Sequence, residues 1–202
     1  MADKAQFQEA VKRGSAFAWR GQWADAAREY RQALALSPDD ASALNYLAMA
    51  LFKSGQLEEA LECYRRVWKT QPANLSALQK VAEVQDAMGD KDSAIASYRQ
   101  ISDQQMKRNS PDEALKALQK VVELRPTEAE SWSALMSVAA LAGNLGDMIP
   151  RSLTLARELF LKDRFQDAFR VAEQVQSIDP TNLAVPRLIA AFRKGLEYSY
   201  RT

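Results

Sequence analysis

The stretch ASALNYLAMALFKSGQLEEALECYRRVWKTQP, residues 41–72, contains two short amphipathic segments separated by the turn Ser54-Gly55-Gln56. Apolar residues recur every three or four positions on both sides of this turn, as they do in helices that bury one face. Isolated helices of this length are only marginally stable in water. The stretch therefore predicts a helix-turn-helix unit that must pack against neighbouring units.

The same pattern occurs 34 positions earlier in the chain. A glycine, an alanine, a tyrosine and a proline recur at this interval, as the pairs Gly21/Gly55, Ala26/Ala60, Tyr30/Tyr64 and Pro38/Pro72. Small residues allow two helices to approach closely, aromatic residues fill the gap to the next unit, and proline ends a helix. The interval therefore predicts a stack of similar helix pairs.

In its period and residue types, this pattern resembles the tetratricopeptide repeat. The first-helix positions of that family are matched by Leu44, Leu47-Ala48 and Leu51, and in the preceding unit by Gly14 and Phe17. The resemblance covers about residues 7–180. It implies an all-α fold, a right-handed α-solenoid of antiparallel helix pairs with about eleven helices.

The spacing of the later prolines predicts how the repeats are arranged. Pro126 lies 54 positions after Pro72, and Pro180 lies 54 positions after Pro126, an interval that exceeds the repeat by about one helix. We expect a single solenoid over 1–202, with regular repeats at 7–38 and 41–72, three-helix units at 73–126 and 127–180, and a capping helix at 183–200. In the unit at 127–180 two residues depart from the family pattern, Met148 at a small-residue position and Ser152 at an aromatic one.

Composition argues against catalysis. The chain has no histidine and one cysteine, and its 27 basic and 26 acidic residues leave a net charge of +1. The commonest general base and metal ligand is therefore missing, and Cys63 has no histidine to activate it. We expect a packed, inert Cys63 and no enzyme activity, catalytic residue, cofactor or metal.

No apolar run in the sequence is long enough for a signal peptide or a membrane span. Together with the lone thiol, this favours a cytoplasmic protein that does not insert into membranes. The near-zero net charge also argues against nucleic acid as the partner, since nucleic-acid binding usually needs a strongly basic surface.

The resemblance implies that the first helices of the repeats line a concave groove, where members of the family hold a peptide. Positions just off the packed ones are the candidate partner-binding residues: Lys12, Trp19, Asn45, Tyr46, Met49, Phe52, Lys53, Lys80 and Arg99. Aromatic and methionine side chains offer adaptable apolar contact, and Asn45 could bond a peptide backbone. The lysines and arginine would suit a partner with some negative charge.

The same helical spacing is also compatible with core packing. Trp19, Met49 and Phe52 could pack between repeats instead of binding a partner, and packing is the favoured interpretation for Trp23, Trp68 and Trp132. Chaperone-binding members of the family clamp a C-terminal carboxylate at positions that correspond to Val11, Ser15, Tyr46, Ser76 and Lys80. Only Lys80 has a suitable side chain, which disfavours a carboxylate clamp.

The leading functional hypothesis is a non-catalytic adaptor or scaffold that binds a peptide or helix of another protein in the groove. The alternative is a regulatory or sensor domain that binds a small peptide or ligand and controls an attached or associated effector. Nothing in the sequence names the partner.

Overall fold

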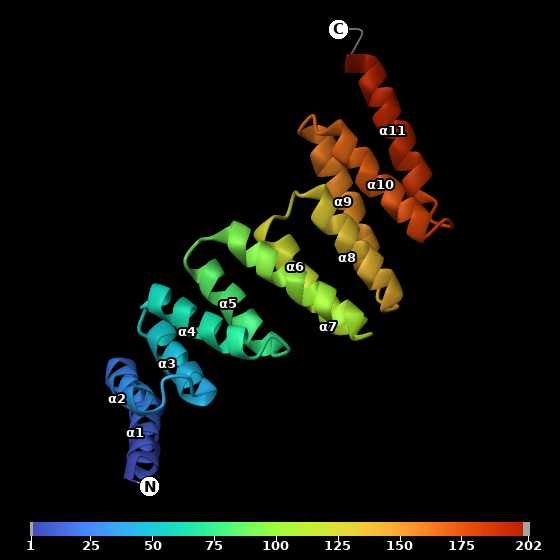
Figure 1. The fold of residues 1–202 in the computed structure, drawn as a ribbon. Coiled ribbons are helices and arrows are strands. Elements are labelled where there is room, and N and C mark those ends of the chain that lie inside the picture. Colours follow the sequence, from blue (N-terminus) through green and yellow to red (C-terminus); the bar gives the residue numbers. More distant parts are fainter. Residues whose placement is uncertain (1, 200–202) are drawn as a thin grey trace. The chain divides into compact units, whose positions relative to one another are not determined.

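Short turns divide the chain into eleven α-helices in a computed structural model that describes residues 2–199 (Figure 1). The helices are α1 (Ala2–Trp19), α2 (Trp23–Leu36), α3 (Ala41–Lys53), α4 (Leu57–Thr70), α5 (Leu75–Ala87), α6 (Lys91–Lys107), α7 (Pro111–Leu124), α8 (Ala129–Leu141), α9 (Met148–Leu161), α10 (Phe165–Ile178) and α11 (Ala184–Ser199). Within the described residues every regular element is a helix, which confirms the all-α prediction.

The helices form two compact units, residues 1–97 and 98–202, with the boundary inside α6. In the N-terminal unit, each helix from α1 to α4 packs against the one that follows it. In the C-terminal unit, α7 packs on α8, both α8 and α9 pack on α10, and α10 packs on α11. Residues 73–126 contain α5, α6 and α7, and residues 127–180 contain α8, α9 and α10. The assignment of repeats and of a cap to these segments remains a prediction.

Helix α3 ends in a turn that needs a left-handed backbone. Gly55 has a φ of 81°, and the Gln56 backbone N–H donates to the Leu51 carbonyl at 2.9 Å, closing the last turn of the helix. Glycine adopts this conformation without the steric penalty that a Cβ atom brings. Gly21, Gly89 and Gly143 have similar φ values in the corresponding turns. The glycines between the helices therefore allow the chain to reverse its direction.

Alanine allows the helices to approach closely where they cross. The alanines at the small-residue position of α2, α4, α6, α7 and α10 are completely buried: Ala26, Ala60, Ala94, Ala114 and Ala168. Tyr30, Tyr64 and Tyr98 are also buried. These residues form the core that the repeat pattern predicts, because close packing leaves no room for larger side chains at the crossings.

Helix α9 departs from the repeat pattern but is still packed. Met148 and Ser152 are both buried, and within the described residues the Ser152 hydroxyl has no hydrogen-bond partner. Pro150 is the third residue of α9, in the first turn, where a proline removes no helical hydrogen bond.

Gly14 in α1 lies directly against the ring of Tyr30 in α2. A Cβ atom at Gly14 would lie 2.6 Å from Cε1 of Tyr30. The Tyr30 ring also stacks on Tyr46 of α3, with ring centroids 5.5 Å apart. The tyrosine ring is therefore held between α1 and α3, with little room to move.

We predict that Gly14→Ala lowers the free energy of unfolding by up to about 2 kcal/mol. Overpacking against Tyr30 costs about 1–3 kcal/mol, partly offset by about 1 kcal/mol from the better helix propensity of alanine. Urea unfolding measures the change. In a Tyr30→Leu background the same substitution should be neutral or stabilising, and an equal loss in both backgrounds would contradict this explanation.

We predict that Gly55→Ala destabilises the chain through backbone strain alone, by about 1–2 kcal/mol. Nothing lies within 4 Å of a Cβ atom built at Gly55, so crowding does not contribute. Gly146→Ala is the matched control, because its surroundings are equally open and its φ is not positive. The melting temperature should fall for Gly55→Ala and stay constant or rise for Gly146→Ala; equal effects would exclude strain as the cause.

Candidate functional site

The single cysteine is packed in the helical core. Cys63 is 8% exposed in α4, and burial raises the pKa of its thiol. A protonated, buried thiol is a poor nucleophile, as the sequence predicts for this residue. Among the described residues, no group of three or more histidine, cysteine, aspartate or glutamate side chains could hold a metal ion.

The predicted groove residues of the N-terminal unit lie on its first helices, α1, α3 and α5. We call the set Lys12, Trp19, Asn45, Tyr46, Met49, Phe52, Lys53 and Lys80 the first-helix face. The 34-residue repeat relates its members, since Lys12, Tyr46 and Lys80 occupy one repeat position and Trp19 and Lys53 another. Equivalent positions of stacked repeats project to the same side of the stack.

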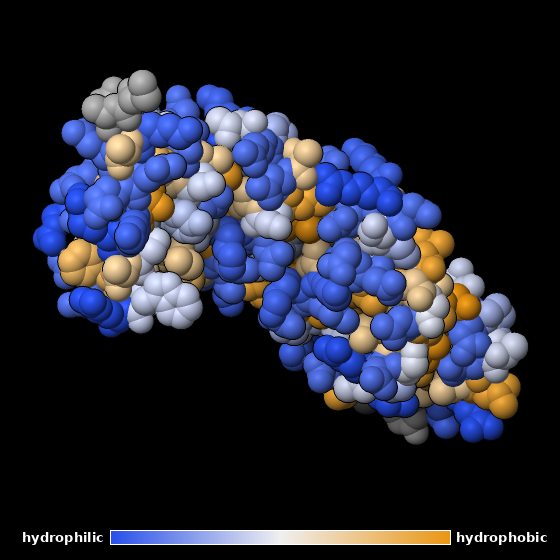
Figure 2. All heavy atoms as spheres, turned by 90° about the horizontal axis from the view of Figure 1, so that it is seen from below, coloured by the Kyte–Doolittle hydropathy of each residue, from blue (hydrophilic) through white to orange (hydrophobic). Residues whose placement is uncertain are grey.

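Large apolar side chains of this face are exposed to solvent. Trp19 is 91% exposed, Tyr46 is 41% exposed and Met49 is 37% exposed, whereas Phe52 and Asn45 are half-buried. Figure 2 shows hydrophilic residues over most of one face of the molecule, with hydrophobic residues in smaller areas between them. The 91% exposure means that Trp19 is not a core residue.

The side chain of Tyr46 is held in place by its contact with Tyr30. Its ring stacks on Tyr30 at an interplanar angle of 28°, and the Tyr30 hydroxyl lies 3.3 Å from the Ser15 hydroxyl. The conformation of Tyr46 is therefore set before any partner arrives, which reduces the entropy lost on binding.

The charges of the first-helix face are unevenly paired. Lys80 forms an ion pair with Glu83 at 2.6 Å, whereas Lys12 and Lys53 are exposed and make no ion pair with any described residue. The α1 and α3 part of the face therefore combines apolar side chains with two uncompensated positive charges.

Arg99 lies in the C-terminal unit. It donates to Glu128 at 2.9 Å and to Ser131 at 3.0 Å, and so connects α6 to the start of α8. Burial alone would raise the pKa of Glu128, but hydrogen bonds from Ser131 and Arg125 and the charge of Arg99 outweigh it and lower that pKa. Arg99 is thus engaged in an ion pair between helices of its own unit.

The other tryptophans differ from Trp19. Trp132 is buried and donates its indole N–H to the Pro126 carbonyl at 2.7 Å, as the packing interpretation expects. Trp23 and Trp68 are half-buried, and the Trp68 indole N–H has no partner among the described residues. At the clamp positions, Lys80 is paired with Glu83, and valine, serine and tyrosine occupy the rest.

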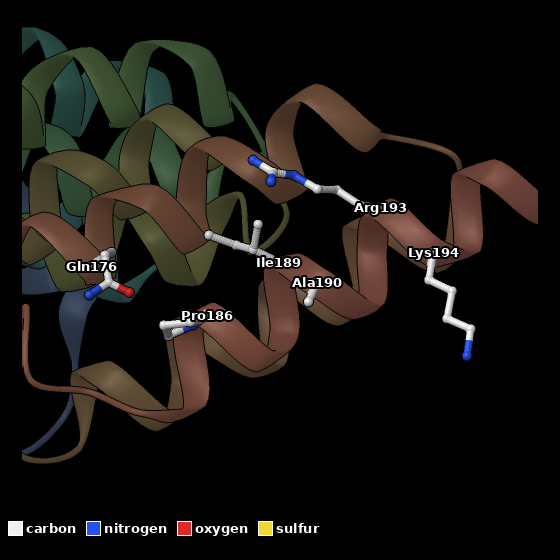
Figure 3. A pocket seen from close by; sticks show the side chains of 6 residues that line it. All are labelled: Gln176, Pro186, Ile189, Ala190, Arg193 and Lys194. Carbon is white, nitrogen blue, oxygen red and sulfur yellow. The ribbon is translucent and has the colours of Figure 1, made fainter.

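Two further hollows lie outside the predicted groove. One, of about 650 Å³, is formed by α10 and α11 and lined by Gln176, Pro186, Ile189, Ala190, Arg193 and Lys194 (Figure 3). The other, of about 700 Å³, is formed by α1 and α2. Neither hollow is predicted from the sequence, because the spacing of apolar residues does not show which helix faces remain uncovered.

No helix among the described residues combines the length and the apolar character that a membrane crossing requires.

Comparisons with known proteins agree with the repeat. Two tetratricopeptide repeat models match the chain, one over residues 20–81 and one over residues 76–105. No curated protein sequence matches the chain.

Several solved structures have a similar fold. The TPR2B domain of yeast Sti1 in its pHsp70 complex has a TM-score of 0.52 at 20% identity, over 61% of this chain and 99% of that one. The P58(IPK) TPR domain has a TM-score of 0.45 at 11% sequence identity, and the match covers 98% of this chain and 67% of that one. The Sgt2 TPR domain from Aspergillus fumigatus has a TM-score of 0.43 at 20% sequence identity, and the match covers 65% of this chain and 76% of that one. At these identities the likeness concerns the fold alone.

The paired helices, the buried alanines and the glycine turns define a helical-repeat protein. Residues 20–105 match the tetratricopeptide repeat models, so this part of the chain is built of tetratricopeptide repeats. Tetratricopeptide repeat domains are typically non-catalytic and generally act as protein–protein interaction modules.

We predict that Tyr64 contributes to a loss of stability at alkaline pH. Burial and the nearby Glu83 carboxylate raise the pKa of Tyr64 to about 12, above about 10 in the unfolded chain. The folded state then holds the proton more tightly, so the free energy of unfolding falls as pH rises from about 10 to about 12. Urea unfolding across this range should show a shallower fall for Tyr64→Phe; identical pH dependence in both proteins would contradict the assignment.

Proposed function

We propose that the chain is a non-catalytic adaptor that binds a peptide or helix of another protein on the first-helix face of its N-terminal unit. The observation that carries the proposal is the exposure of Trp19, Tyr46 and Met49 on the first helices α1 and α3. Large aromatic side chains cost free energy when left in water, and they dominate the energetics of protein interfaces.

The chemistry of the face indicates the kind of segment that it accepts. Trp19, Tyr46 and Met49 would contact apolar side chains of the partner, and the half-buried Asn45 amide has both a donor and an acceptor for an extended backbone. Lys12 precedes Trp19 in α1, and Lys53 follows Met49 in α3. Their positive charges favour a partner segment with negative charge.

The mode of binding differs from a carboxylate clamp. The Sti1 domain of yeast is a tetratricopeptide repeat in complex with pHsp70, which supports a protein as the partner of this chain. However, Lys80 is the one clamp-type side chain at the five corresponding positions, and Glu83 neutralises it. We therefore infer that apolar anchoring, and not a free C-terminal carboxylate, gives most of the affinity.

We predict that Trp19→Ala weakens partner binding at least tenfold, which is about 1.4 kcal/mol or more. Peptides selected from a displayed random library on the wild-type chain provide the ligands, and fluorescence anisotropy gives Kd. Because Trp19 is 91% exposed, its loss should leave the circular dichroism spectrum and the melting temperature unchanged.

Met49→Ala and Leu36→Ala form a matched pair for the same measurement. Met49 is 37% exposed on the face, and Leu36 is 40% exposed on α2 outside it. Met49→Ala should weaken binding and Leu36→Ala should not. Peptide affinities that are unaffected by both Trp19→Ala and Met49→Ala would exclude this face as the binding site.

A further inference from the structure

Helix α11 begins four residues after Pro180, and α3, α5 and α8 begin three residues after Pro38, Pro72 and Pro126. The second residue after the proline caps the helix in α3 and α5, where Asp40 accepts from the Ala43 N–H and Asn74 from the Ala77 N–H. Asn182, at the same position, accepts from the Ala184 N–H. The four helices can therefore be compared by counting from the proline.

The residues six, nine, ten and thirteen positions after the proline form one stripe along a helix. In α3, α5 and α8 this stripe is at most 5% exposed; it consists of Leu44, Leu47, Ala48 and Leu51, of Leu78, Val81, Ala82 and Gln85, and of Trp132, Leu135, Met136 and Ala139. Gln85 accepts a hydrogen bond of 2.7 Å from Ser97 of α6, so in α5 the stripe faces the helix that follows.

In α11 the same stripe is largely open to solvent, since three of its residues are exposed and Ile189 is half-buried. It consists of Pro186, Ile189, Ala190 and Arg193, all of which line the hollow of about 650 Å³. Figure 3 shows Arg193 extending along the helix toward Ile189, while Lys194 projects away from the other labelled side chains. The hollow therefore lies on the stripe that faces the following helix α6 in α5.

The preceding side of α11 is already packed. Val185, Leu188 and Phe192 are buried. The Phe192 ring stacks on Phe160 of α9 at 4.3 Å and meets Phe169 of α10 edge-on at 5.6 Å. Helix α11 thus behaves as a first helix that is packed on its preceding neighbours and lacks a second helix within the described residues.

We propose that this hollow receives an acidic amphipathic helix of a partner protein, in the place of a second helix. Ala190 occupies the position of the buried Ala48 and Ala82, so a partner helix can approach closely there. Arg193 and Lys194 line the hollow, and no described side chain that lines it carries a carboxylate. A helix with acidic residues beside an apolar stripe complements both features.

The same charges disfavour two other occupants. A second copy of this hollow would again present Arg193 and Lys194 and no lining carboxylate, so it would leave the positive charges uncompensated. An anionic membrane would need a broad apolar face, but Val185, Leu188 and Phe192 are already buried within the unit. The proposed site shares no residue with the first-helix face and does not depend on it.

The test uses a probe peptide built on α4, the helix that follows and packs against the first helix α3. The peptide has the sequence of residues 57–70 with Cys63→Ala, Arg65→Glu, Arg66→Glu and Lys69→Glu, and a fluorescein label for anisotropy. A basic control peptide has Cys63→Ala, Glu58→Lys, Glu59→Lys and Glu62→Lys. We expect saturable binding of the acidic peptide to the full chain and none of the basic one.

Variants of the full chain locate the binding. Ala190→Phe fills the approach position and should weaken binding at least tenfold, as should Arg193→Glu combined with Lys194→Glu. Ala191→Phe is the matched control, because Ala191 is exposed on the same helix beside the stripe; it should bind like wild type. Trp19→Ala should also bind like wild type, which separates this test from that of the first-helix face.

Three results would overturn the proposal. The first is no saturable binding of the acidic peptide up to about 1 mM, and the second is equal binding by Ala190→Phe and wild type. The third is the absence of peptide binding together with binding of another occupant. Sedimentation would then show that Ala190→Phe abolishes self-association, or vesicle measurements would show that Arg193→Glu abolishes binding to phosphatidylserine vesicles.

Discussion

Two helices can lie close together only where neither carries a bulky side chain at their crossing point. In this chain buried alanines such as Ala26 and Ala60 meet that requirement, and the remaining features follow from it. The glycine turns bring each pair into contact, and Tyr30 fills the space beside the crossing, between Gly14 of α1 and the ring of Tyr46. Because the core is close-packed, a change of one methyl group at such a position is felt by the neighbouring helix.

The same packing determines which residues remain for function. Apolar residues at the repeat positions are used for contacts between helices, so a large exposed apolar side chain such as Trp19 is left over from the folding pattern. Tyr46 takes part both in packing between helices and in the exposed surface, since its ring packs on Tyr30 and it remains 41% exposed. A surface prepared in this way loses little entropy on binding, which suits a module that recognises other proteins.

Much of the fold was predictable because the repeat records packing requirements at fixed spacing. The helix pairs, the glycine turns and the buried alanines could all be derived from residues 7–72 and then extended. The site was less predictable, because spacing places a residue on a helix face but does not reveal its neighbours. Lys80 and Arg99 both seemed available in the sequence, whereas Glu83 pairs with the first and Glu128 with the second. Trp19 fitted core and surface equally well until its surroundings were known.

The sequence alone determined the helical repeat, the close crossings at alanine and the lack of histidine-based chemistry, because these depend on residue type and local spacing. Only the tertiary structure decided which positions are covered. Ala48 and Ala190 occupy the same repeat position, yet Ala48 is completely buried and Ala190 lines an open hollow beside α10. The difference arises because burial depends on whether another helix packs against a position, and the residues of a single helix do not contain that information.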